Sequence, residues 1–228
     1  TLSPNISFAN NSTVYSSGNI LLSGISSDAA SWLWSVKLEI KNWTDYFDWT
    51  SFSNSTIQLI TNSSDSYSNW NYNFNIPWTI NNWTSMEIKA FSYDKAYKTP
   101  NIWSGKITVI KDISWPNINS WAILFPTSTW SFRWWQTIDI KWDSSKITDS
   151  ISWLKTNSIE LEYLDWAWNY QTIASGLANN WTYTWTIPSY DRTNSKIRIK
   201  ATDNVWLYTY QLSDSFLVDS LPPEITSL

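Results

Sequence analysis

The sequence has no cysteine and no histidine among its 228 residues. Disulfide bonds and thiolate chemistry are therefore excluded, and the usual general base and the usual zinc ligand are missing. Only 15% of the residues are charged, with a net charge of −4. Without a basic stripe to neutralise phosphates, nucleic acid is not an expected partner. No apolar run approaches the ~18 residues of a membrane span.

Glycine is almost as scarce, with 4 residues, whereas tryptophan is abundant, with 20. Average usage of glycine is about 7%. The tryptophans follow Asn, Asp and Arg in segments typical of turns, such as N-W-T at Asn42, Asn82 and Asn180, F-R-W-W-Q at Phe132 and D-W-A-W-N at Asp165. Tight turns in an all-β chain need residues that accept a positive φ, and glycine is the usual one. A bulky residue at such a position is an outlier.

Glycine in place of tryptophan turns each of these segments into an ordinary turn signal, such as N-G-T or D-G-A-G-N. Sixteen positions fit this interpretation: Trp32, Trp34, Trp43, Trp49, Trp83, Trp103, Trp115, Trp121, Trp130, Trp134, Trp135, Trp153, Trp166, Trp168, Trp181 and Trp206. The replacement raises glycine from 4 to 20 residues. The hypothesis is an alternative genetic code, in which UGA codons for glycine are translated as tryptophan.

Four tryptophans remain after this replacement. Trp142 and Trp185 lie in alternating strand patterns and are expected to be buried, whereas Trp70 and Trp78 are left unassigned. The competing interpretation is a protein truly rich in tryptophan that binds sugars through aromatic platforms. Under the glycine hypothesis the sixteen positions lie exposed at turns and strand ends, some with positive φ. Trp103 and Trp121 border apolar strands and are the expected exceptions.

The chain repeats with a period typical of one β-domain. Short proline segments recur around Pro4, Pro116 and Pro223. Ser68–Pro77 (S-N-W-N-Y-N-F-N-I-P) also parallels Asn179–Pro188 (N-N-W-T-Y-T-W-T-I-P). The predicted organisation is a first repeat over residues 1–113, a second over 114–220, and a linker or start of a third over 221–228. The chain opens on Thr1 without a methionine, so it is expected to be a fragment or a processed piece.

Alternation of apolar and polar residues predicts strands in both repeats. Apolar residues recur at every second position, and those predicted to face the core are Val36, Leu38, Ile40, Ile138, Ile140, Leu161, Ile197 and Ile199. A period of two with one polar face is typical of antiparallel sheets half exposed to water. The predicted fold is all-β, with two tandem antiparallel immunoglobulin-like β-sandwiches of about 110 residues each.

With glycine restored, the second repeat reads F-R-G-G-Q-T-I-D-I-K-W, L-D-G-A-G-N-Y, N-G-T-Y-T-W-T-I-P and K-A-T-D-N-V-G. This resembles the bacterial immunoglobulin-like (fibronectin-III-like) repeats of large secreted and surface proteins. Two departures stand out: Leu207 replaces a usual Asn, and the first repeat reads S-Y-D-K-A-Y instead of a T-D-x-x-G motif. The resemblance implies the sandwich fold and a tandem surface context, and no catalytic, cofactor-binding or metal-binding residues.

Carboxylates supply two weak candidates for chemistry. Asp203, Asp219 and Glu224 lie near a repeat boundary and could supply oxygen ligands to a structural calcium ion at the domain junction, although aspartates in turns also serve local hydrogen bonds. Asp143 and Asp149 could form a carboxylate pair for glycoside hydrolysis, against the plainer interpretation of solvated loop acids.

Two further patterns concern the surface. Sequons occur at Asn5, Asn11, Asn54 and Asn62, where an Asn/Ser/Thr-rich chain also produces them by chance. Three aromatic residues near one turn either form a patch that binds sugar or peptide, or cover the end of a small core: Tyr46, Phe47 and Phe52.

The expected function is a non-catalytic, extracellular module of a large bacterial surface protein, acting as a stalk, spacer or adhesion segment. Its expected partners are neighbouring repeats and surface glycans or proteins. The alternative is a carbohydrate-binding or accessory module of a secreted hydrolase. An enzyme is not expected, because histidine and cysteine are missing and carboxylates are scarce.

Overall fold

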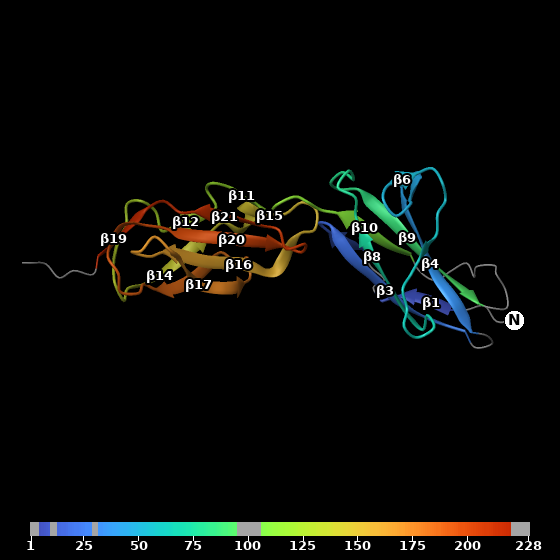
Figure 1. Cartoon of the computed structure of the whole chain (residues 1–228). Coiled ribbons are helices and arrows are strands. Elements are labelled where there is room, and N and C mark those ends of the chain that lie inside the picture. Colours follow the sequence, from blue (N-terminus) through green and yellow to red (C-terminus); the bar gives the residue numbers. More distant parts are fainter. Residues whose placement is uncertain (1–4, 10–12, 29–31, 95–105, 220–228) are drawn as a thin grey trace, which may run out of the picture. The chain divides into compact units, whose positions relative to one another are not determined.

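Figure 1 shows the computed structural model, in which strands follow one another along the chain. The structure describes residues 5–9, 13–28, 32–94 and 106–219. In these ranges the regular structure is β-strand apart from one 3-10 turn, η1 (Ser144–Lys146), which confirms the all-β prediction. The same ranges contain no helix with the length and apolarity needed to cross a membrane. The chain divides into two compact units, Thr1–Ile113 (unit 1) and Ser114–Leu228 (unit 2).

Unit 1 contains two sheets. The smaller sheet has the order β1-β3-β8 and is antiparallel throughout; its strands are β1 (Asn5–Phe8), β3 (Asn19–Ser27) and β8 (Asn69–Asn75). The larger sheet has the order β2-β10-β9-β4-β5-β6, with β7 beside β4. Its strands are β2 (Val14–Ser16), β10 (Lys106–Lys111), β9 (Ser85–Asp94), β4 (Leu33–Asn42), β5 (Asp45–Phe47), β6 (Phe52–Ser53) and β7 (Leu59–Ile60).

The core of unit 1 lies between these two sheets, because both contribute to one hydrophobic cluster. The larger sheet contributes Val36, Leu38 and Ile40 from β4, all 0% exposed, as the alternation predicts. The smaller sheet contributes Leu22 from β3 and Phe74 from β8. Burying one apolar face of each sheet supplies the main stabilising term, about 1.5–3 kcal/mol for each large side chain.

The described residues of unit 2 form four short sheets. Two of them follow the pattern of unit 1. The first has the order β12-β14-β18 and consists of β12 (Ile123–Phe125), β14 (Thr137–Trp142) and β18 (Thr182–Thr186). The second has the order β17-β16-β20-β21 and consists of β17 (Tyr170–Leu177), β16 (Leu154–Leu164), β20 (Ile197–Asp203) and β21 (Tyr208–Leu212). The others are β13-β22-β19, from β13 (Ser131–Arg133), β22 (Phe216–Asp219) and β19 (Arg192–Ser195), and β11-β15, from β11 (Asn117–Ile118) and β15 (Ile147–Thr148).

The core of unit 2 is again shared by facing sheets. Ile138 and Ile140 of β14 belong to one cluster with Leu161 of β16 and with Ile197 and Ile199 of β20, and all five are at most 7% exposed. Every core residue expected from the period-two alternation is therefore buried. The core is one continuous cluster although the strands are divided among several sheets.

The two units pair their strands by the same rule. In unit 1, β3 lies between β1 and β8, β4 pairs with β9, and β10 pairs with β2 in parallel. In unit 2, β14 lies between β12 and β18, β16 pairs with β20, and β22 pairs with β13 in parallel. Each unit is thus a sandwich-like arrangement built in the same order from its own stretch of sequence.

Candidate functional site

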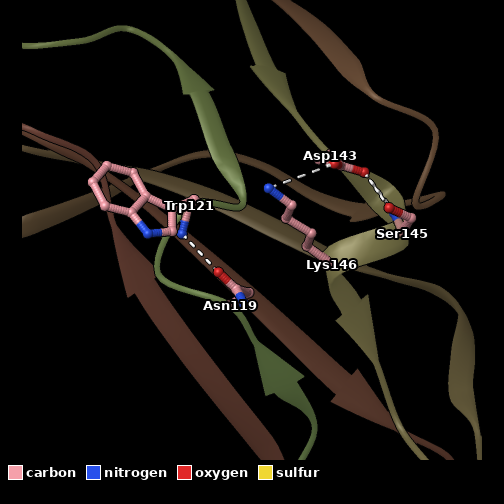
Figure 2. A network of polar contacts seen from close by, with 5 residues as sticks. All are labelled: Asn119, Trp121, Asp143, Ser145 and Lys146. Carbon is pink, nitrogen blue, oxygen red and sulfur yellow. Dashed lines mark hydrogen bonds and ion pairs between the residues drawn. The ribbon is translucent and has the colours of Figure 1, made fainter.

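Surface tryptophans are the most conspicuous feature of both units. Fifteen of the sixteen tryptophans assigned to turns lie in the described residues, and they are between 44% and 85% exposed. Trp103 lies outside the described residues. Trp121 was expected to be an exception, and that expectation is wrong, because it is 74% exposed on a turn in front of β12 (Figure 2). Such residues either form ligand platforms or occupy positions where the backbone needs no side chain.

The backbone conformation at these residues bears on the choice between the two possibilities. Eight of the exposed tryptophans have a positive φ: Trp43, Trp49, Trp83, Trp135, Trp153, Trp168, Trp181 and Trp206. Within the described residues, they account for eight of the eleven non-glycine residues with positive φ. This region is disfavoured for every residue with a Cβ, and a bulky residue there is an outlier.

Two of these turns show why the backbone takes this form. The Asp165 Oδ1 atom accepts hydrogen bonds from the backbone N–H groups of Ala167 and Asn169, both at 2.8 Å, and Trp168 lies inside the loop with φ 65°. The Asp203 Oδ1 atom accepts from Val205 and Leu207, both at 2.9 Å, and Trp206 has φ 69°.

In each turn the tryptophan N–H donates to the aspartate carbonyl at 3.3 Å, and the tryptophan is the left-handed residue, which is the glycine position of three-residue hairpin loops. In the first of the two turns, the backbone hydrogen bonds also favour the ionised carboxylate of Asp165. The amide of Asn169 above all holds the pKa of Asp165 below its ordinary value of 3.8.

The F-R-W-W-Q segment forms another such turn. The backbone N–H of Gln136 donates to the carbonyl of Arg133 at 3.2 Å, so that Trp134 and Trp135 are the two central residues. Trp135, the second of them, has φ 64°. A positive φ at the second central position of a β-turn requires glycine or asparagine in ordinary sequences.

The remaining tryptophans differ in environment. Trp142 and Trp185 are 1% and 7% exposed, which confirms their predicted burial, and the Trp142 indole donates to Asn179 Oδ1 at 2.9 Å. Trp70 is also 1% exposed and packs edge-on against Phe8 with ring centroids 5.2 Å apart. Trp78 is 89% exposed. Burial thus places Trp70 with the core tryptophans and Trp78 with the surface ones.

Asp143 caps a turn. It precedes η1, and its Oδ1 accepts from the backbone N–H and the hydroxyl of Ser145 at 3.0 and 2.6 Å, while Lys146 Nζ lies 3.9 Å from Oδ2 (Figure 2). The Ser145 hydroxyl holds its pKa below the ordinary value, so the group stays ionised. Asp149 is engaged elsewhere, accepting from the backbone N–H groups of Ile151 and Trp153. Each carboxylate therefore stabilises a separate turn.

Of the three residues considered for calcium, the two in the described ranges are not brought together. Asp203 ends β20 and is buried, whereas Asp219 ends β22 and is exposed. β22 pairs with β19, which precedes the opposite end of β20, so Asp203 and Asp219 are separated by the length of that strand. Glu224 lies outside the described residues.

The aromatic residues considered as a surface patch belong mainly to the core. Phe47 is 2% exposed and contacts Phe74 and Phe52, with ring centroids 5.0 and 5.5 Å apart. Tyr46 is half-buried beneath Lys41. Three of the sequon asparagines are exposed, and the fourth, Asn11, lies outside the described residues; the exposed ones are Asn5, Asn54 and Asn62.

A second surface feature, which sequence reasoning missed, lies on unit 2. Leu161, Ile197 and Ile199 point into the core, so the alternate residues of β16 and β20 lie on the opposite face of the sheet. This face, called here the tyrosine face, consists of Glu160, Glu162, Tyr170, Arg198, Lys200, Tyr208 and Tyr210. The alternation of polar residues was visible in the sequence, but their pairing depends on strand register.

Charged and aromatic side chains alternate across the tyrosine face. Arg198 pairs with Glu162, and Lys200 pairs with Glu160 at 3.1 Å. The Arg198 guanidinium lies 3.8 Å from the ring centroid of Tyr170, and Lys200 Nζ lies 4.7 Å from that of Tyr208. Tyr208 and Tyr210 remain 46% and 54% exposed. The face offers aromatic surface and fixed hydrogen-bonding groups.

No protein-family model matches this chain, and no curated protein matches it. The candidate features therefore rest on their own geometry.

Proposed function

We propose that the chain is a non-catalytic segment of a large extracellular bacterial protein, made of two tandem immunoglobulin-like repeats that act as a stalk, spacer or adhesion segment. The observation that carries this proposal is the recurrence of one strand-pairing rule in two units with separate cores. Repetition of a self-contained sandwich is the simplest way to build length from one module. The lowered pKa values of Asp48, Asp143 and Asp165 come mainly from turn hydrogen bonds, which favours a structural role for these acids over a catalytic one.

The same proposal includes the identity of the surface tryptophans, which we infer to be glycine in the natural protein. A residue with a Cβ costs about 1–2 kcal/mol in the left-handed region. Eight tryptophans with positive φ would therefore cost about 8–16 kcal/mol, as much as the whole 5–15 kcal/mol of a typical protein's stability. Glycine removes this cost at every position.

The glycine identity also bears on function. A protein that bound sugars through these tryptophans would place them on a common surface. Instead the eight with positive φ are divided between the two units, three in unit 1 and five in unit 2. This distribution does not favour a tryptophan platform.

Carbohydrate binding by an accessory module is the second candidate, and the tyrosine face is the observation that favours it. Its exposed tyrosines are tyrosine under either genetic code, so they survive the replacement of tryptophan by glycine. Aromatic faces bordered by fixed polar groups are suited to the apolar and polar sides of a sugar ring.

Force spectroscopy on the full chain, with glycine at the sixteen positions, tests the stalk. Two separate unfolding events are expected, each lengthening the chain by about 350 Å, because roughly 100 residues extend by ~3.5 Å each. A single event, or unfolding without a force peak, contradicts a stalk made of two modules.

A glycan array with the same protein tests the second candidate. Binding that is lost in Tyr208→Ala and Tyr210→Ala, and retained in the unit 1 control Tyr15→Ala, would favour the accessory module. Binding that survives both tyrosine-face substitutions would remove the tyrosine face as its cause.

A further inference from the structure

Two buried aspartates meet within unit 2. Asp149 lies in the loop between β15 and β16, and Asp203 ends β20. They are 7% and 0% exposed, and carboxylate oxygens of the two lie within 4.8 Å of each other. Two ionised carboxylates so placed repel each other, and burial strengthens the repulsion.

Each carboxylate is fixed by its own turn. Asp149 Oδ1 accepts from the backbone N–H groups of Ile151 at 3.0 Å and Trp153 at 2.9 Å. Asp203 Oδ1 is held in the same way by its own turn. Asn204 joins the two turns, because its side-chain amide donates to the carbonyl of Ser152 at 2.7 Å and its backbone N–H donates to that of Trp153 at 3.1 Å.

One carboxylate oxygen of this pair is not used by the turn hydrogen bonds. Asp149 Oδ2 is almost inaccessible to solvent and has no hydrogen-bond partner among the described residues. A buried charged oxygen left in this condition costs more than an ordinary lost hydrogen bond. Either a proton shared with Asp203 or a cation between the two groups would compensate for it.

We propose that Asp149 and Asp203 bind a divalent cation of the Ca²⁺ type. Ca²⁺ takes carboxylate and carbonyl oxygens at about 2.3–2.6 Å in irregular geometry. An upper separation of 4.8 Å is about twice a Ca²⁺–oxygen distance of ~2.4 Å, so one ion between the groups contacts both. Mg²⁺, at ~2.0–2.1 Å and with strict octahedral demands, fits less well. The proposal concerns unit 2 alone and does not depend on the proposed function.

A shared proton and a bound cation predict different responses to Asn. Asp149→Asn and Asp203→Asn keep the Oδ1 acceptor for the turn, so they remove the charge and preserve the local hydrogen bonds. If a proton is shared, the pair carries one negative charge, so either substitution replaces the protonated group and leaves the protein indifferent to Ca²⁺. If Ca²⁺ binds, either substitution lowers the affinity for Ca²⁺ by at least tenfold. Asp214→Asn, at an exposed position in unit 2, is the matched control.

The experiment measures the Tm of the full chain in EDTA and in 10 mM CaCl₂. For a Kd of about 0.1 mM, within the range of extracellular calcium modules, Tm rises by about 10 °C. The rise is retained in Asp214→Asn, smaller with MgCl₂, and lost in Asp149→Asn and Asp203→Asn.

Equilibrium dialysis with ⁴⁵Ca²⁺ on the unsubstituted chain covers the case in which a variant does not fold. One bound ion per chain near 0.1–1 mM supports the site. Equal Tm in EDTA and CaCl₂, no saturable binding, or a Ca²⁺ response that persists in both Asn variants overturns it.

Discussion

The two units share a strand-pairing pattern and differ in whether the paired strands at one edge are continuous or interrupted. In unit 1, the continuous strand β9 pairs with β10 along one edge. In unit 2, the corresponding stretch is divided between β19 and β20, and its partner between β22 and β21. Ser213 lies at this division, where its hydroxyl accepts from the backbone N–H of Ile197 and its own N–H donates to the carbonyl of Ile197. The core alternation is thus kept while local hydrogen bonds decide how a strand is interrupted.

Their exposed faces differ as well. Unit 1 carries a small ion-pair cluster, in which Glu87 contacts Lys89 at 3.0 Å and Lys106 at 2.8 Å. Unit 2 carries the tyrosine face, where ion pairs are flanked by aromatic rings. Exposed pairs of the first kind contribute about 0–1 kcal/mol and carry little specificity. If one unit binds a ligand, the comparison favours unit 2.

The largest expected difference between the units comes from glycine. Three of the positive-φ tryptophans lie in unit 1 and five in unit 2. At roughly 1 kcal/mol for each position, replacement by glycine should raise the free energy of unfolding by about 3 kcal/mol in unit 1 and about 5 kcal/mol in unit 2. Urea unfolding of the full chain, with one unit replaced at a time, measures both values.

The control for this prediction uses core positions. Trp142→Gly and Trp185→Gly should each lower the stability of unit 2 by about 3–5 kcal/mol, because they empty buried volume. Peptide mass spectrometry of the natural protein gives an independent answer, since the two residues differ greatly in mass. Tryptophan found at most of the sixteen positions in the natural protein would end the glycine interpretation.

A smaller difference is expected between the buried tryptophans Trp142 and Trp70. The indole of Trp142 donates to Asn179, whereas Trp70 Nε1 is buried and has no hydrogen-bond partner in the part of the chain that the structure describes. Trp142→Phe leaves the Asn179 oxygen without its donor and should cost about 1–3 kcal/mol beyond the lost volume. Trp70→Phe removes an unsatisfied donor, so its cost should be limited to volume.

Thermal or urea unfolding of the two variants gives this comparison. In a double-mutant cycle, Trp142→Phe and Asn179→Ala should be non-additive, because they remove the same hydrogen bond. Equal costs for the two Phe variants, together with additivity in the cycle, would show that the hydrogen bond contributes nothing.

The sequence was sufficient to predict which residues form the core, and it was insufficient to predict the burial of Trp70. A period of two places Val36, Ile140 and Ile199 on buried faces whatever the detailed register, so their burial was predictable. The repeat pairs Trp70 with Trp181, and yet they are 1% and 56% exposed. The difference depends on Gly24 of β3, where a Cβ would lie 2.3 Å from Trp70 Cζ2. No local sequence pattern indicates this close approach of Gly24 and Trp70.

The surface features were predictable to different degrees. Turn chemistry is local, so residues such as Trp135 and Trp206 could be assigned to turns from their immediate neighbours. The tyrosine face and the pairing of Asp149 with Asp203 depend on which strands lie side by side. The ion pairs of the tyrosine face and the aspartate pair join residues 36 to 54 positions apart, and alternation alone does not define them.

The smallest expected effect is acid sensitivity, which the units should share. The pKa values of Asp48 in unit 1 and Asp165 in unit 2 are lowered from 3.8, first by backbone hydrogen bonds from Ser51 and Asn169, respectively. A lowered folded pKa means that the unfolded chain binds the proton more tightly. The stabilisation is therefore fully present above the unfolded pKa, near 4, and is lost as the pH falls through the folded pKa.

Urea unfolding at pH 7, 4 and 3 should accordingly show a decrease confined to the acid end. Asp48→Asn and Asp165→Asn keep the acceptor oxygen and lose the charge, so each should flatten the pH dependence of its own unit and leave the other unchanged. Asp214→Asn, at an exposed position of unit 2, should leave the profile of that unit as it is. An Asp165→Asn variant with an unchanged profile would assign the acid loss of unit 2 to other carboxylates, with Asp143 the next to replace because its pKa is lowered as well.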